Sequence, residues 1–148
     1  MKRLTLLLFA LIALFASVSV TASARAADAS VTAILIQGSN EGGGVDSQLR
    51  RYERHLSHML PFDTFKQRGQ GSSRVSLPGN GSIDIGGGQL VAVKVEDGGG
   101  DKLRITARWT DGNRTLINTT IVSSRGKPTV LGGPSSGNGK LILLLIAQ

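Results

Sequence analysis

The sequence predicts an α+β fold class, in which one amphipathic helix packs on an antiparallel β-sheet or small β-sandwich of about six or seven strands. Three observations predict it. Residues 46–60 carry apolar side chains at the three- and four-residue steps of a helix. After residue 61, turn signals separate short apolar segments about every ten residues, the spacing of an antiparallel meander or sandwich. Residues 141–146 form an apolar run of strand length.

The first 26 residues predict a secretory signal peptide. Residues 1–3 are a short basic start, residues 4–20 are apolar apart from three hydroxyl side chains, and Ala24 and Ala26 complete an A-x-A order. We expect cleavage after Ala26, which leaves one domain of residues 27–148. The alternative is a retained membrane anchor, because the apolar run approaches the ~18 residues typical of a membrane span.

The mature domain carries little net charge. The full chain has 17 Lys and Arg against 10 Asp and Glu, and the loss of Lys2, Arg3 and Arg25 with the leader lowers the net charge to +4. This charge suits solubility and weak attraction to anionic surfaces, and argues against a nucleic-acid partner. The chain has no cysteine, which excludes a disulfide framework and a lipidated cysteine. Burial of apolar side chains must therefore hold the fold.

The first mature elements are a predicted strand and a predicted helix. Residues 30–37 are aliphatic and β-branched, which favours one buried strand. After a glycine-rich loop, Asp46 is placed to cap a helix that runs to about Leu60, where Pro61 ends it. One side of this helix is apolar and carries Leu49, Tyr52, Leu56 and Met59.

The opposite side of this helix, which we name the basic helix face, carries Arg50, Arg51, Arg54, His55 and His58. It is a candidate contact for an anionic partner such as lipid head groups, cell-wall polymer or an acidic protein surface. The competing interpretation is a solvated surface, which charge runs usually form. His55 and His58 could face one site, but a metal ion needs further ligands and arginines surround the two histidines. We therefore expect no metal and no cofactor.

The rest of the chain predicts strands. Residues 62–68 and 74–77 are short candidates, followed by a turn at 78–81. Alternation of apolar and polar side chains marks three further strands, and Asp111-Gly112 is a hairpin signal before a fourth. The later strands are expected near residues 83–85, 90–95, 103–109 and 115–122.

The apolar run 141–146 is too short for a membrane helix, which needs about 20 residues. It is apolar at successive positions, as a strand must be when both its faces are covered. Asn138-Gly139 is a hairpin signal before it, and residues 129–131 are a plausible partner strand. We therefore expect 141–146 to be a central strand of the sheet.

Two catalytic patterns overlap in the preceding loop. Residues 133–137 match G-x-S-x-G with Ser135 at its centre, but a nucleophile elbow needs a helix after the serine, and here a turn and a strand follow. The general base would have to be His55 or His58. Residues 137–141 are similar to a phosphate-binding loop, but they lack the hydroxyl residue after the lysine and the following helix, so we reject that interpretation.

Residues 126–133, Gly-Lys-Pro-Thr-Val-Leu-Gly-Gly, precede the Leu/Ile-rich strand, and this region resembles the glycine turn of bacterial secretins, the outer-membrane channels of secretion and pilus systems. The resemblance covers about the last fifth of the chain. The chain is much too short for a secretin and lacks the multi-domain periplasmic part of that family. The resemblance implies an exported β-module engaged in envelope assembly, with no functional residue to carry over. In layout the chain also resembles small exported proteins of environmental bacteria.

The sequence as a whole predicts an exported, non-enzymatic binding or assembly module of the bacterial cell envelope, associated with secretion or pilus systems. We expect it in the periplasm, at the outer membrane or secreted. Its partner would be an envelope protein or an anionic envelope surface, and no integral membrane span would remain after signal cleavage. The alternatives are a small serine hydrolase that uses Ser135 and an inhibitor that presents glycine-rich loops to a secreted enzyme.

Overall fold

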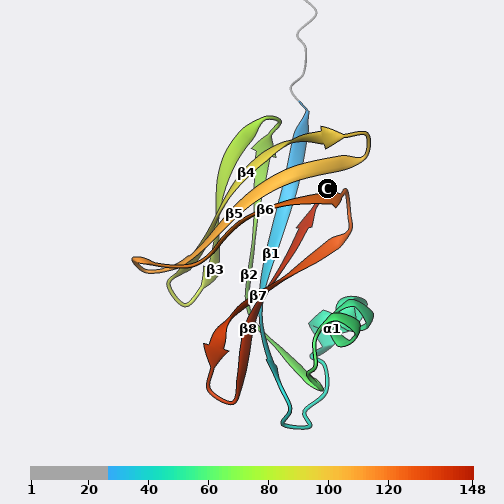
Figure 1. The fold of residues 1–148 in the computed structure, drawn as a ribbon, viewed down its shortest axis with the longest axis vertical. Helices are drawn as coiled ribbons and strands as arrows, with labels where there is room; N and C mark the ends of the chain where they lie inside the picture. Colours follow the sequence, from blue (N-terminus) through green and yellow to red (C-terminus); the bar gives the residue numbers. More distant parts are fainter. Residues whose placement is uncertain (1–26) are drawn as a thin grey trace, which may run out of the picture.

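The computed structural model describes residues 27–148, which form two four-stranded antiparallel sheets and one short helical segment (Figure 1). The predicted signal peptide lies outside the described residues. Sheet A has the strand order β2-β1-β8-β7 and sheet B the order β3-β4-β5-β6. The strands of sheet A are β1 (Asp28–Ser39), β2 (Thr64–Ser76), β7 (Pro128–Ser136) and β8 (Gly139–Ala147). Those of sheet B are β3 (Gly79–Gly86), β4 (Gln89–Gly99), β5 (Lys102–Asp111) and β6 (Arg114–Ser124).

The fold is therefore mostly β and contains less helix than the predicted α+β class implies. The helical segment consists of a 3-10 helix η1 (Ser47–Tyr52) and the α-helix α1 (Glu53–Met59), and it lies beside β7 and β8 (Figure 1). At seven residues, α1 makes only two turns, too little to form a full layer over a four-stranded sheet. The expected antiparallel sheets are present, and the helical segment packs on sheet A.

The predicted helix over 46–60 differs from the observed one at its start. The Asp46 carboxylate does not cap it, because Oδ2 accepts the backbone N–H of Gln67 on β2 at 2.8 Å. The Asp46 N–H donates to the carbonyl oxygen of Phe65 at 3.0 Å, which ties the chain to β2 just before the segment. The Asp46 carbonyl accepts the N–H of Leu49 at 2.9 Å, an i to i+3 contact. The first turns therefore take the tighter 3-10 geometry.

The predicted apolar side of the helix is only partly buried. Leu49 and Leu56 are 0% exposed, and Tyr52 lies half-buried beside them. Met59 is 59% exposed, so its predicted place in the apolar stripe is wrong. The helix ends there, and half-buried Leu60 packs on sheet A instead. Two leucines thus anchor the segment.

β8 is a central strand with both faces covered, which confirms the prediction for residues 141–146. It pairs with β1 on one side and β7 on the other, and Leu131 of β7 lies opposite Leu143, as the hairpin signal predicted. Leu143 and Leu145 face the core between the sheets, whereas Ile142 and Leu144 face the helical segment. Alternate residues of β8 therefore serve two different hydrophobic clusters.

The core between the sheets includes Trp109 of β5, which is fully buried. Its Nε1 donates to Oε1 of Gln89 at 2.8 Å, so the one polar atom of the ring is paired. Gly133 of β7 lies against the ring, and a Cβ atom there would come within 2.5 Å of the Trp109 Cζ3 atom. The second glycine of the Gly-Gly pair thus has a packing role in this chain.

One side of the sandwich is closed by contact between the sheet edges. The predicted strands 62–68 and 74–77 are one continuous strand, β2, whose edge lies against β3. A Cβ atom on Gly69 would overlap the carbonyl oxygen of Ile85, and one on Gly71 would overlap that of Asp84. The glycine-rich middle of β2 is therefore strand rather than loop, because only glycine lets the two backbones meet here.

None of the helices in residues 27–148 is long and apolar enough to cross a bilayer.

Candidate functional site

The basic helix face lies on a short segment that the core holds in place. Leu49 and Leu56 point into the cluster formed with Phe65 of β2, Ile36 of β1 and Ile142 of β8. Phe65 meets Phe62 edge-on at a centroid distance of 6.4 Å, which closes the cluster below the helix. The residues between the buried leucines must then project into solvent. The basic side chains accordingly emerge from a fixed backbone.

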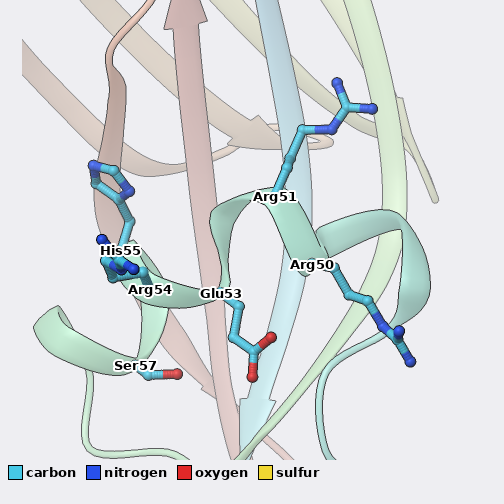
Figure 2. Close-up of a pocket in the computed structure, with 6 residues that line it drawn as sticks. All are labelled: Arg50, Arg51, Glu53, Arg54, His55 and Ser57. Carbon is cyan, nitrogen blue, oxygen red and sulfur yellow. The ribbon is translucent and has the colours of Figure 1, made fainter.

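All five predicted residues of the basic helix face are exposed: Arg50, Arg51, Arg54, His55 and His58. Figure 2 shows that Arg50, Arg51 and Arg54 do not converge on one point. Arg50 and Arg51 point in different directions from one part of the segment, whereas Arg54 and His55 extend from another part. The Arg51 guanidinium carbon lies 5.9 Å from the centre of the Tyr52 ring, within the range of a cation–π contact.

Two open depressions lie along this face and share Arg54 and His55. The first is lined by Arg50, Arg51, Glu53, Arg54, His55 and Ser57, the residues drawn in Figure 2. The second is lined by Arg54, His55, His58 and Met59. Both are open to solvent, so the arrangement suits contact with a broad anionic surface better than enclosure of a small ligand.

Within the described residues, no carboxylate forms an ion pair with the basic helix face. Within residues 27–148, the one ion pair joins Lys94 and Glu96 on β4, at 3.2 Å. Glu53 lines the first depression but lies beyond ion-pair distance of the arginines around it. The guanidinium groups are therefore not held in internal ion pairs and can contact an external anion.

His55 and His58 have no partners for holding a metal ion. In the part of the chain that the structure describes, no group of three or more His, Asp or Glu side chains is close enough to bind one. The two histidines share the second depression with Arg54, whose charge would repel a cation.

Ser135 lies in a strand hairpin. It is exposed on β7, opposite Lys140 of β8, next to an irregularity in the pairing that begins at Gly132. The turn and strand that follow it provide no helix for a nucleophile elbow. Within the described residues, no hydrogen bond joins Ser135 to His55 or His58, so a serine–base pair is not assembled here.

A second set of cations, not singled out from the sequence, lies on the outer face of sheet B. Lys102, Arg104 and Arg108 are exposed at alternate positions of β5, a spacing that already predicts one shared face. Here the cations are interleaved with polar and acidic groups. Arg104 lies across from Glu96 in the ladder, and the Arg108 guanidinium donates to the Thr115 hydroxyl at 3.3 Å.

Comparison of the chain with protein-family models, curated proteins and solved structures finds no match. The resemblance of residues 126–133 to the secretin glycine turn therefore stays a prediction.

Proposed function

We propose that the protein is an exported, non-enzymatic binding or assembly module of the bacterial cell envelope, associated with secretion or pilus systems. In this proposal the basic helix face holds the domain against an anionic partner, either an envelope surface or an acidic envelope protein. Export rests on the predicted leader, and the envelope setting is favoured by the secretin resemblance and the absence of cysteine.

The observation that carries the proposal is the exposed charge of the basic helix face, which forms no ion pair within the described residues. Three arginines and two histidines project from one anchored segment, and none is in an ion pair within the described residues. An arginine near an anionic lipid surface contributes about 1 kcal/mol to binding. Three arginines acting together would therefore contribute about 3 kcal/mol, which is about a hundredfold in affinity.

The test uses the protein recovered after export of the full chain. Binding to vesicles with anionic lipid, to neutral vesicles and to isolated cell wall is measured by co-sedimentation at two salt concentrations. The variant carries Arg50→Gln, Arg51→Gln and Arg54→Gln. We expect it to lose at least about tenfold in affinity for an anionic surface, and the original protein to bind less tightly in high salt because salt screens exposed charges.

The matched control removes the same number of positive charges from sheet B, through Lys102→Gln, Arg104→Gln and Arg108→Gln. It lowers the net charge equally, so it separates a local site from a general charge effect. Retention within about threefold of the original is expected for this control, because a remote charge acts only through the screened field of the whole domain. Equal losses in both variants, or unchanged binding in the helix variant, would contradict the proposal.

A further inference from the structure

The four edge strands of the two sheets differ in how they are protected. β2 and β3 cover each other through the glycine contacts described above. β7 carries Pro128 and Pro134 and an irregularity between Gly132 and Ser135, all of which hinder pairing with a further strand. β6 has no proline and no glycine, and its one charged residue is Arg114 at its first position. Its pairing with β5 is irregular at Leu116 and regular from Ile117 to Ser124. β6 is therefore the unprotected edge of the sandwich.

The hydrogen-bonding groups of β6 that face away from β5 can be identified from the ladder. Just beyond the end of β6, the Arg125 N–H donates to the Asp101 carbonyl oxygen at 3.0 Å, so residue 125 is a hydrogen-bonded position of the β5–β6 ladder. In an antiparallel ladder such positions recur at every second residue. Residues 117, 119 and 121 then bond to β5, and the backbone groups of Asn118, Thr120 and Val122 point to the free edge. Within residues 27–148 these outward groups have no backbone partner.

The side chains of β6 are also incompletely covered. Ile117 and Ile121 are half-buried at the margin of the core between the sheets. Val122 is 53% exposed on the outer face. An added strand would cover these side chains and satisfy the outward backbone groups at the same time.

We propose that β6 pairs antiparallel with β6 of a second copy of the chain and joins the two copies of sheet B into one continuous sheet. A two-fold axis through Thr119 sets Ile117 opposite Ile121 of the other copy, on the core side, and Asn118 opposite Thr120, on the outer side. The one charge of β6, Arg114, falls at the end opposite the two serines that finish the strand, so no two like charges lie directly opposite each other. Such an interface is isologous, the usual form of a homodimer.

The symmetric register favours a second copy over a strand from another protein. It extends the apolar core with the chain's own isoleucines and uses every outward backbone group of residues 118–122. The two proposals fail independently, because the basic helix face packs on sheet A and takes no part in the pairing of β6.

The first test uses the natural absence of cysteine, because any disulfide must then form at an introduced thiol. Thr119 bonds to β5, so across the two-fold axis it forms a non-hydrogen-bonded pair with a Cα separation of about 4.5 Å, which a disulfide can bridge. Thr119→Cys in the exported full chain, treated with oxidised glutathione, is expected to become mainly a covalent dimer. Ser82→Cys on β3, the other edge of sheet B, is the matched control and should form no disulfide-linked dimer, although it keeps the β6 edge.

The second test is Asn118→Pro, which removes an N–H that faces the free edge and leaves the β5–β6 ladder complete. We expect the dimer dissociation constant, measured by sedimentation, to rise at least about tenfold, since hydrogen bonds at the new ladder are lost. The thermal midpoint of the dilute monomer reports whether the variant folds.

The proposal is overturned if folded Thr119→Cys protein cross-links no more than the Ser82→Cys control. It is also overturned if Thr119→Cys instead captures a different envelope protein, or if Asn118→Pro leaves an existing dimer unchanged. The Arg50, Arg51 and Arg54 glutamine variant should dimerise like the original chain, since the basic helix face lies on sheet A.

Discussion

The two sides of the sandwich are built differently. Along β2 and β3 the two sheets meet backbone to backbone, because Gly69 and Gly71 leave no side chain between them. Along β6 and β7 the described contacts are side-chain hydrogen bonds near the connecting turn, where the Thr129 hydroxyl donates to Ser123 Oγ at 3.2 Å. The closed side fixes the relative position of the sheets, and the open side leaves a strand edge available. The β2–β3 side therefore stabilises the monomer, whereas the proposed pairing of two copies uses the β6 edge on the other side.

The largest effect is expected on the closed side. Gly69→Ala would place a methyl group on the carbonyl oxygen of Ile85, and neither backbone can move without separating the sheets. We expect a loss of about 4 kcal/mol or more in the free energy of unfolding, measured by urea denaturation. Gly132→Ala on β7 is the matched control, because its methyl group would meet only the flexible end of Lys140 at 3.5 Å. Equal stability of the two variants would show that the glycine contacts do not close the sandwich.

An intermediate effect is expected at the one close glycine contact of β7. Gly133→Ala would press on the Trp109 ring and would place its methyl group 2.9 Å from the Leu141 carbonyl oxygen. Overpacking of this kind costs about 1–3 kcal/mol. The chain contains a single tryptophan, so its fluorescence reports the change directly. An unchanged emission spectrum together with unchanged stability would contradict the packing role of Gly133.

The smallest effect on the folded monomer is expected at the open edge. Val122→Thr keeps a β-branched side chain at a position that is half exposed. Its free energy of unfolding, measured at low protein concentration, should stay within about 0.5 kcal/mol of the original. A loss comparable to that of Gly133→Ala would mean that the β6 edge contributes to the monomer core after all.

Local signals predicted the strands well where one pattern dominates. Residues 103–109 alternate cleanly and lie in β5, and residues 141–146 lie in the central strand β8. The middle of β2 was missed because its glycines and serines resemble a loop, and their role appears only when β3 is alongside. The 3-10 start of the helix was missed for a similar reason, since β2 rather than the local sequence occupies the Asp46 carboxylate.

The candidate site was predictable in its composition and not in its shape. Arg50, Arg51 and Arg54 lie between the apolar positions Leu49 and Leu56, and this spacing already predicts that their side chains face solvent. Their spread over two depressions depends on side-chain directions around a short 3-10 turn. The free edge of β6 follows only from the strand order, because the same residues would be buried if a ninth strand were present.

The pairing of β1 with β8 has a consequence for how the domain is made. Ser30 and Gln148, from opposite ends of the described chain, exchange two backbone hydrogen bonds of 2.9 Å each. Sheet B is a run of consecutive hairpins, whereas the two central strands of sheet A, β1 and β8, lie at opposite ends of the described residues. We therefore expect the pairing of β1 with β8 to limit the folding rate of the domain, because contacts between residues far apart in the sequence form slowly.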